Sequence, residues 1–408
     1  MPPTQLVRLA FRNVFRQRLR SALTLGAIAF GVLGLVVSGG FVHDIFIQLG
    51  EAVVHSQSGH IQIAREGFFT YGSQSSEKFL IGNPGAIASR VQALPEVAQV
   101  MGRFHFSGLL GNGRTTLPIV GEGIEPEKEA KLGTYMTIKT GRNLQPGQPL
   151  GMLVGEGVAR ALDLKPGDPV SLVTPSAEGA MNSLDCDVVG TFQSFSRDYD
   201  DRAVKILLPA AQDLLGTPGA NLLVVELRST SDTVRATTAI RQLLAGSGLE
   251  VRNWMELNDF YGKTVELYDR QFGILRLIVL VMVLLCVANT VNMSLFERIP
   301  EFGTMCALGD RRSKVLALVM TEGLILGLVG SAIGLALGIL LALALSAVGI
   351  PMPPPPNSNL DYMAQVRIVP VVIAGAAAVG VAATLLATVV AARRVTGFSI
   401  VDALRRSV

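Results

Sequence analysis

The sequence is poor in charge and in aromatic residues for its length. Of its 408 residues, 16% are Asp, Glu, Lys or Arg and 6% are aromatic, whereas 49% are hydrophobic. Soluble globular domains have roughly a quarter of their residues charged. This composition therefore excludes a soluble enzyme, a disordered protein and a simple DNA-binding domain, and an integral membrane protein is expected instead.

Charge is absent altogether from long stretches of the chain. Residues 21–43, 277–296 and 368–392 contain no Asp, Glu, Lys or Arg, and Glu322 alone interrupts residues 315–360. A helix that crosses the hydrocarbon core of a bilayer needs about 20 apolar residues. We therefore predict transmembrane helices at 21–46, 273–295, 318–347 and 368–391.

Cysteine and histidine are also scarce, with three and four copies. Cys186 is alone in the polar segment between the first two spans, so that segment has no internal disulfide. The histidines share no metal-ligand spacing, and no nucleophile-base set or carboxylate pair can be placed by spacing. We predict no catalytic, cofactor-binding or metal-binding residue in this chain.

Basic residues are unevenly distributed among the loops. The N-terminal segment, the loop after the second span and the C-terminal tail hold 13 basic and 4 acidic residues, whereas residues 49–268 hold 19 basic and 24 acidic residues. Lys and Arg are enriched in cytoplasmic loops. We therefore expect both termini in the cytoplasm and the large middle segment outside.

Four arginines recur every four residues near the N-terminus. Arg8, Arg12, Arg16 and Arg20 line one face of a helix predicted over residues 1–20, and apolar residues occupy much of the opposite face. This pattern is typical of an amphipathic helix on a lipid surface, with its arginines among the headgroups. The same arginines also contribute to the topology signal.

The middle segment contains two similar sets of strand and helix signals, separated by an insertion over about residues 125–200 that has short alternating strands. Two such β-α-β units are typical of a ferredoxin-like fold. The predicted fold class is an α-helical membrane protein with four transmembrane helices plus an α+β extracytoplasmic domain, in which ferredoxin-like βαβ units carry a small mostly-β insertion. The expected strand, helix and strand are 59–64, 83–94 and 97–110 in the first set, and 221–228, 231–245 and 249–253 in the second.

Both helices that flank the middle segment extend beyond their spans. Residues 41–55 continue the first span with apolar residues at helical spacing, and residues 254–271 lead directly into the second span. We infer that the two helices form a stalk that carries the domain; two unrelated juxtamembrane helices are the alternative. A proline-rich run at residues 351–356 cannot continue a helix and is expected to connect spans three and four outside.

A short amphipathic segment follows the second span on the predicted cytoplasmic side. A charged start, an apolar row and a final glycine predict a helix over about residues 297–309. Such a helix is suited to docking into a groove on a partner, and a solvated connector is the alternative. The residues that make this pattern are Glu297, Arg298, Phe302, Met305, Leu308 and Gly309.

Small residues recur every four positions in the third span. In lipid, such rows allow helices to approach closely. Glu322 lies near the cytoplasmic end of the same span, where snorkelling or an arginine partner suffices to accommodate it; proton coupling is the alternative. The small residues are Gly323, Gly327 and Ser331 in one row and Gly330, Gly334 and Gly338 in the other.

These segments resemble, in the same order along the chain, the motifs of FtsX-like ABC transporter permeases. The resemblance covers residues 8–18, residues 297–309 with their basic continuation, and the tail at residues 400–405; Pro300 and Ser399 depart from the family pattern. One span, a domain of about 220 residues and three further spans is similar to the lipoprotein-releasing LolC/LolE type. Residues 155–159, 164–168 and 254–257 are similar to a MacB-type periplasmic domain.

The resemblance implies a domain plan and a coupling site. The plan is a cytoplasmic amphipathic helix at 1–20, a transmembrane helix at 21–48, a periplasmic MacB-like domain with stalk at 49–271 and an FtsX-like permease domain at 272–408. The residues expected to couple to an ATPase are Glu297, Arg298, Glu301, Phe302, Gly303, Met305, Leu308 and Gly309.

It also implies partners and a location. The chain is expected in the bacterial inner membrane with a pair of cytoplasmic ABC ATPases, which would hold ATP and Mg, and a second permease chain, either an identical copy or a paralogue. Membrane lipids and a lipoprotein or a periplasmic chaperone or adaptor are further expected partners; nucleic acid is not.

Gly262-Lys263-Thr264 resembles the end of a P-loop, but Leu257 stands where that motif needs glycine, so we expect no ATP site and no enzyme activity in this chain.

The function implied by the resemblance is the ATP-driven movement of a lipoprotein or similar amphiphile from the outer leaflet of the inner membrane or from the periplasm. A separate ATPase would power it through motion of the stalk. The alternative is an FtsX-like transmembrane signalling scaffold that activates a periplasmic partner and transports nothing.

The orientation can be tested by labelling cysteines in intact cells. A thiol reagent that does not cross membranes should leave Cys306 unmodified, because that residue lies in a predicted cytoplasmic loop. The same reagent should reach Cys186 if the fold exposes it. Labelling of Cys306 from outside would contradict the predicted orientation.

Overall fold

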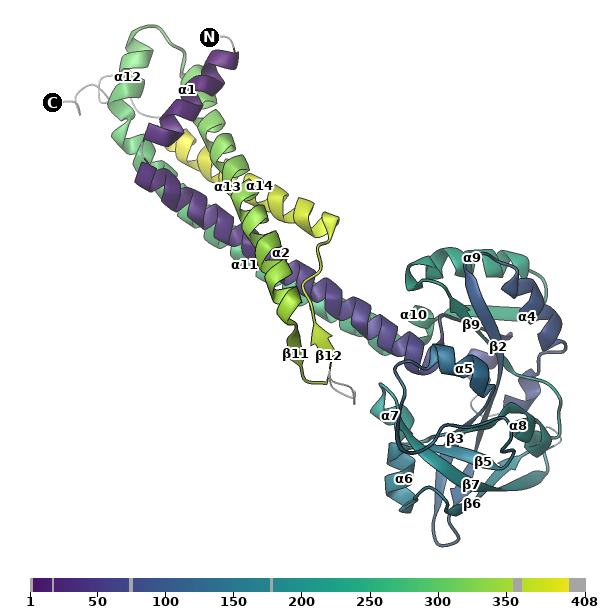
Figure 1. The fold of residues 1–408 in the computed structure, drawn as a ribbon. Helices are drawn as coiled ribbons and strands as arrows, with labels where there is room; N and C mark the ends of the chain where they lie inside the picture. The colour runs from purple at the N-terminus through teal and green to yellow at the C-terminus, as the bar shows by residue number, and fades with distance from the viewer. Residues whose placement is uncertain (1–2, 17, 73–75, 177–178, 355–361, 396–408) are drawn as a thin grey trace. The chain divides into compact units, whose positions relative to one another are not determined.

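The computed structural model describes residues 3–16, 18–72, 76–176, 179–354 and 362–395. The chain divides into two compact units (Figure 1). The helical unit comprises residues 1–46, 264–351 and 363–408, and the α/β unit comprises residues 47–263 and 352–362. The tail motif at residues 400–405 and part of the proline-rich run at 351–356 lie outside the described residues.

Within the described residues, four helices are long and apolar enough to cross a membrane by their length and composition. They correspond to the four charge-free stretches, so the prediction of four long apolar helices at these positions is confirmed. All four are longer than their predicted spans at one end or both. They are α2 (Arg18–Val53), α11 (Asp259–Glu297), α13 (Arg312–Val348) and α14 (Pro370–Val395).

Two shorter helices lie at the end of the helical unit where α2 begins, namely α1 (Pro3–Arg16) and α12 (Ile299–Ala307) (Figure 1). The helix predicted over residues 1–20 is described as α1 up to Arg16 and as α2 from Arg18, so Arg20 belongs to α2. Gly309 follows α12 with a φ of +100°. Only glycine adopts such a conformation at little cost, and it lets the N–H of Asp310 donate to the carbonyl of Met305 at 3.0 Å.

The glycines of α13 lie where this helix packs against α2 and α14. A Cβ atom at Gly334 would lie 2.6 Å from the carbonyl oxygen of Ala29, and one at Gly327 would lie 3.2 Å from Cβ of Thr384. The first distance leaves no room for a Cβ and the second is tighter than an ordinary contact, so α13 lies directly against both neighbours. The facing pairs are Gly323–Thr388 and Gly327–Thr384 toward α14, and Gly330–Ile28, Gly334–Ala29 and Gly338–Val36 toward α2.

An acidic residue that the sequence analysis did not single out lies buried in α2. Asp44 has no exposed surface. Its carboxylate accepts hydrogen bonds from Arg367 Nε at 2.7 Å and from the backbone N–H of Gln365 at 2.8 Å. These residues precede α14, so Asp44 fixes the start of α14 against α2. The connection between α13 and α14 also contains β11 (Ile350–Met352) and β12 (Tyr362–Ala364).

The first half of the α/β unit is an antiparallel sheet in the order β10-β1-β9-β2. Helix α4 follows β1 and helix α9 follows β9, so both predicted sets of strand, helix and strand are present. Asn83 caps α4 by accepting a hydrogen bond from the N–H of Ala86 at 3.1 Å. The elements are β1 (Ile61–Arg65), α4 (Pro84–Gln92), β2 (Val97–Gly111), β9 (Leu222–Leu227), α9 (Thr233–Leu243) and β10 (Leu249–Asn253).

The second half is built around a closed ring of strands, in which β2, β3, β8, β5, β7 and β6 pair in turn and β6 returns to β2. Its interior holds a large apolar cluster that includes Phe104, Phe106 and Phe192. The strands are β3 (Thr116–Ile124), β4 (Thr137–Gly141), β5 (Gly151–Gly155), β6 (Pro169–Pro175), β7 (Met181–Gln193) and β8 (Ala203–Leu207). The helices are α5 (Pro126–Leu132), α6 (Glu156–Leu162), α7 (Arg197–Asp200) and α8 (Leu208–Leu215).

Strand β2 belongs to both halves, and buried charges lie where it passes from one to the other. Arg103 of β2 donates to Glu129 at 2.5 and 2.8 Å, and Glu122 of β3 lies 3.0 Å from Lys205 Nζ. Burial alone would raise the pKa of Glu122, but Lys205 and Arg103 lower it well below its usual value. Removing one partner would leave a buried charge uncompensated, so this cluster fixes how the two halves are joined.

The predicted continuous helix over residues 254–271 is interrupted. Residues Trp254–Leu257 form the separate short helix α10, and Asn258 leaves helical geometry with φ −121° and ψ 78° before α11 begins. The first stalk helix is continuous to Val53 as predicted and passes into a π-helical turn at Val54–Ser58. The remaining short helical segments are α3 (Phe68–Tyr71), Ser76–Phe79 and Thr230–Asp232.

Cys186 is buried, with 3% of its surface exposed. Burial, with Asp185 and Asp187 as neighbours, raises the pKa of its thiol to about 12. Because the thiolate is the reactive form, Cys186 is not a usable probe of orientation. Met181 lies in the same unit with 66% of its surface exposed, so Met181→Cys supplies the external label that the topology experiment needs.

The close packing of α13 predicts a position-dependent effect of added methyl groups. We expect Gly334→Ala to lower the stability by about 1–3 kcal/mol, because the new Cβ must displace backbone atoms of α2. The matched control is Gly26→Ala, since a Cβ there has nothing within 4 Å. Thermal unfolding of the purified chain in detergent, followed by circular dichroism, measures both. Equal melting temperatures for the two variants would contradict the packing described here.

Candidate coupling site in the helical unit

The predicted coupling segment is tied to the N-terminal region by ion pairs. Arg16 of α1 donates to Glu301 of α12 at 2.6 Å, and Arg20 of α2 forms a two-pronged pair with Glu297 at the end of α11. Arg16 and Glu301 are about half exposed, at 54% and 46%. Exposed pairs contribute only about 0–1 kcal/mol, so these contacts orient the segment more than they stabilise it.

A buried ion pair connects the coupling segment to α13. Arg298 Nη1 donates to Glu322 at 2.8 Å, and the two side chains are only 8% and 12% exposed. The second carboxylate oxygen of Glu322 accepts from the side-chain amide of Asn13 at 2.7 Å. Breaking a buried pair by removing one partner costs about 3–5 kcal/mol. This pair is therefore the strongest polar link between α1, α13 and the coupling segment.

Arg298 also binds the acidic residue that Arg16 contacts. Its Nε donates to Glu301 at 3.2 Å, and its guanidinium lies 5.0 Å from the ring centre of Phe302. Partial burial by itself raises the pKa of Glu301. Hydrogen bonds from Arg16 and Arg298 together lower this pKa by more than burial raises it, so the net shift is downward. Glu301 is therefore ionised near neutral pH and keeps both arginines in place.

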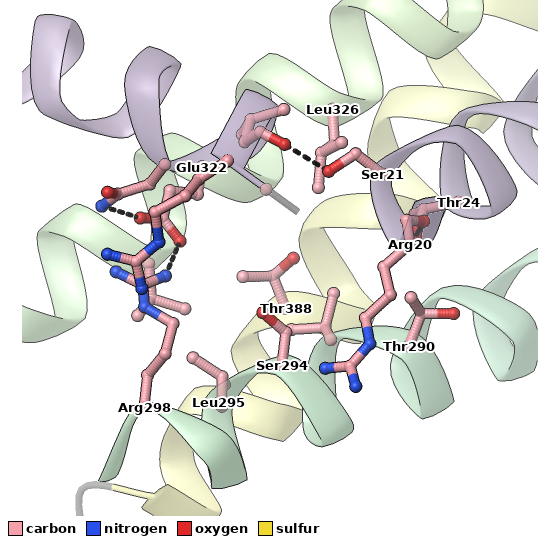
Figure 2. Close-up of a pocket in the computed structure, with 16 residues that line it drawn as sticks. Arg20, Ser21, Thr24, Thr290, Ser294, Leu295, Arg298, Glu322, Leu326 and Thr388 are labelled. Atoms are coloured by element: carbon pink, nitrogen blue, oxygen red, sulfur yellow. Dashed lines mark hydrogen bonds and ion pairs between the residues drawn. The ribbon is translucent and has the colours of Figure 1, made fainter. Parts of the chain in front are cut away.

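A small pocket of about 50 Å³ opens beside this pair (Figure 2). Figure 2 shows Arg298 and Glu322 on one side of it and Arg20 on the other. A buried water needs roughly 10–15 Å³ and two to four polar partners, so the pocket has room for a few waters. Its remaining polar lining consists of Arg16 and of hydroxyl and amide side chains, namely Asn13, Ser21, Thr24, Thr290, Ser294 and Thr388.

A larger groove of about 250 Å³ lies between α1 and the coupling segment. Asn13, Arg16 and Arg298 line both this groove and the small pocket, whereas Glu301 lines only the groove. Its apolar lining consists of Leu9, Met305 and Leu318, and Asp310 and Lys314 complete it. The groove therefore offers apolar surface framed by charges of both signs.

The predicted coupling residues separate into an inward and an outward set. Arg298, Phe302 and Gly303 are buried within the chain and Met305 is partly buried. Leu308 is 85% exposed, which is extreme for a large apolar side chain. The other exposed members of the set are Glu297, Glu301 and Gly309.

The arginine row near the N-terminus is placed differently from the sequence expectation. Arg8 and Arg12 are exposed on α1, as a lipid-surface helix requires. Arg16 and Arg20 instead form ion pairs with Glu301 and Glu297. The periodicity of the row carries no information on acidic partners that lie nearly 300 residues away, so sequence reasoning could not have found these pairs.

Asn13 was missed by the sequence analysis. Its side chain donates to Glu322 from an element more than 300 residues distant. The sequence offers little indication of this role, because a single asparagine is common on the exposed face of an arginine-rich amphipathic helix. Glu322 itself was recognised, and Arg298 is the arginine partner that the sequence left unspecified.

Two family models match this chain. The MacB-like periplasmic core domain matches residues 21–243, which is more than half of the sequence, and the FtsX-like permease C-terminal model matches residues 273–400. The first match covers α2 and most of the α/β unit. The second covers α11 from residue 273 onward and the whole of α12, α13 and α14, including most of the site described above.

Similar proteins occur among archaea and bacteria. The chain is 24% identical to an uncharacterised ABC transporter permease of Methanocaldococcus jannaschii, over 85% of this chain and 86% of that protein. It is 24% identical to the lipoprotein-releasing system transmembrane protein LolC of Neisseria meningitidis serogroup B, over 82% and 80%. It is 23% identical to the macrolide export ATP-binding/permease protein MacB of Escherichia coli, over 84% of this chain and 53% of that protein.

The family matches agree with the four transmembrane-length helices and the mixed α/β unit. The chain therefore belongs to the ABC transporter permeases that combine a MacB-like periplasmic core domain with an FtsX-like permease C-terminal region.

Proposed function

We propose that this permease is the membrane subunit of an ATP-driven transporter in which a separate cytoplasmic ATPase pair binds ATP and Mg and drives motion of the permease. The observation that carries the proposal is the construction of α12. Arg298, the residue before its first turn, is held by the buried pair with Glu322, and Leu308, the residue after its last turn, has 85% of its surface exposed. A partner that captures Leu308 can move α12, and the buried pair passes that movement to α13.

The motion would reach the α/β unit along α2 and α11. Both helices contribute residues to both units, because α2 runs from Arg18 to Val53 and α11 from Asp259 to Glu297. A continuous α-helix resists bending, since every backbone hydrogen bond must be kept in an apolar medium. We propose that these two helices are the stalk through which nucleotide-driven movement is transmitted.

The proposed substrate is a lipoprotein or a similar amphiphile taken from the outer leaflet of the inner membrane or from the periplasm. The name of the Neisseria meningitidis relative, a lipoprotein-releasing system protein, supports this choice. Each buried CH₂ of a lipid anchor contributes about 0.8 kcal/mol, so removing a multiply acylated protein from a membrane requires an energy source such as ATP. The Escherichia coli relative is named for macrolide export, so a smaller apolar cargo is an outcome that the assay below must distinguish.

A second candidate function is an FtsX-like signalling scaffold that activates a periplasmic partner without transport. The match of residues 273–400 to the FtsX-like model supports it. ATPase activity in proteoliposomes discriminates between the two. Stimulation by an acylated lipoprotein or a macrolide favours transport, whereas stimulation only by a soluble periplasmic protein favours signalling.

The domain plan and orientation complete the proposal. We place both termini and α12 in the cytoplasm, the α/β unit in the periplasm, and domain boundaries near residues 21–48, 49–271 and 272–408. The strand order β10-β1-β9-β2, with α4 and α9 as connections, supports a ferredoxin-like description of the first half of the α/β unit. The second permease chain is either another copy or a paralogue.

Docking through Leu308 predicts a selective loss of coupling. We expect Leu308→Ala to reduce substrate-stimulated ATP turnover by about tenfold, because truncating a central apolar anchor costs more than about 1 kcal/mol of binding. Leu19→Ala is the matched control, since Leu19 is 77% exposed in the same unit outside α12. ATP hydrolysis by the reconstituted complex measures the effect. Equal activity of the two variants would show that α12 does not dock through its exposed end.

Mechanical transmission predicts that α11 does not tolerate a flexible insertion. We expect Gly-Gly-Ser inserted after Gly262 to abolish substrate release while ATP hydrolysis persists, because the helix is broken between the two units. The same insertion after Gly147, in an exposed turn of the α/β unit, serves as control, since loops tolerate added length at small entropic cost. Release of a labelled lipoprotein from proteoliposomes is the measurement, and full release by the Gly262 variant would reject the stalk.

A further inference from the structure

The sequence contains one tryptophan, and it lies at the base of the α/β unit. Trp254 is the first residue of α10 and is 5% exposed. Its backbone is fixed by a capping box, in which Asn253 Oδ1 accepts from the N–H of Glu256 at 3.0 Å and Glu256 accepts from the N–H of Asn253 at 3.3 Å. Arg241 holds the same carboxylate at 2.7 Å. These contacts fix the backbone that carries the indole ring at the end of β10.

The ring of Trp254 lies between the last turns of α2 and the first turn of α11. On one side it fits against Gly50, where an added Cβ would lie 2.7 Å from Cη2 of the indole. On the other side it contacts Tyr261, with ring centres 4.6 Å apart in an edge-to-face arrangement. Val53 and Val54 complete the buried cluster. A single side chain of the domain thus contacts both helices that leave it.

The indole N–H is not hydrogen-bonded in this position. Nε1 is buried and has no hydrogen-bond partner among the described residues. A buried donor without a partner is unfavourable, and most buried tryptophans find one. The ring is therefore held by packing and not by a hydrogen bond, and a displaced ring would gain a hydrogen bond to water. The unpaired N–H therefore lowers the free energy needed to move the ring out of this position.

We propose that Trp254 is the positioning residue that couples α2 to α11 at the base of the α/β unit. If α2 slides or rotates against α11, the indole ring must leave the space beside Gly50 into which it packs. We call this space the notch at Gly50. The ring therefore keeps the two helices in register at rest and is displaced when they move. The proposal rests on the proposed function, because it assumes that nucleotide binding moves these helices.

The emission of the tryptophan measures its position directly. The permease is reconstituted in lipid nanodiscs with its co-purified ATPase, and the spectrum of the Trp254→Phe complex is subtracted to remove the signal of the partner. We expect a short-wavelength emission without nucleotide, as a dry indole gives, and a shift to longer wavelength with higher acrylamide quenching when ATP and vanadate are added.

A double substitution tests whether the contact with Gly50 matters for coupling. We expect Gly50→Ala to reduce ATP-dependent release of a dye-labelled acylated lipoprotein by about tenfold, because the methyl group overpacks the notch. Phe lacks the outer atoms of the indole that the methyl would meet, so Gly50→Ala combined with Trp254→Phe should restore release. Gly82→Ala is the matched control, since a Cβ there has nothing within 4 Å.

The outcomes separate this proposal from the proposed function. If the emission wavelength of Trp254 does not change with nucleotide, in a complex that still releases lipoprotein when ATP is added, the proposed role of Trp254 is wrong and transport is unaffected. An emission that responds to nucleotide without any ATP-dependent release supports Trp254 and overturns transport in favour of signalling. Equal release by Gly50→Ala and wild type, with equal thermal stability, also overturns the proposal.

Discussion

The buried ion pair between Arg298 and Glu322 is the contact on which the end of the helical unit depends. It joins the segment after α11 to α13, and Asn13 adds α1 to the same carboxylate. In a low-dielectric environment neither charge is stable without the other, so the three elements must stay together or separate at high cost. The exposed pairs of Arg16 and Arg20 surround this core, and because water screens them they can be exchanged for contacts with a partner.

The helices reach this point by two different kinds of packing. Toward α2 and α14, α13 presents glycines and lies directly on its neighbours, an arrangement that gains its stability from dispersion contacts. At the ends of the helices, polar side chains take over, as with Asp44, which is buried and fixed by Arg367. Tight apolar packing in the middle and ionic contacts at the ends thus hold the helices together along their length.

Much of this architecture could be predicted from residue patterns. Charge-free stretches located the helices that form α2, α11, α13 and α14, because the bilayer imposes a minimum apolar length on any spanning helix. Asn83 and Gly309 marked a helix start and a helix end for local reasons of hydrogen bonding and backbone conformation. The limits of local reasoning appear at Arg20, where a regular arginine row passes from α1 into α2, and at Asn258, where a helical pattern is interrupted by one residue that leaves helical geometry.

The sequence by itself determined that the chain enters a membrane, how many times it can cross, and which family it resembles, because hydrophobic length, charge distribution and short motifs are properties of neighbouring residues. Only the tertiary structure decided that Arg298 pairs with Glu322, that Asn13 donates to the same carboxylate, and that the ring of Trp254 packs against Gly50. Each of these contacts joins residues from different helices, some of them hundreds of positions apart. Their partners are selected by the packing of whole helices, which no local pattern records.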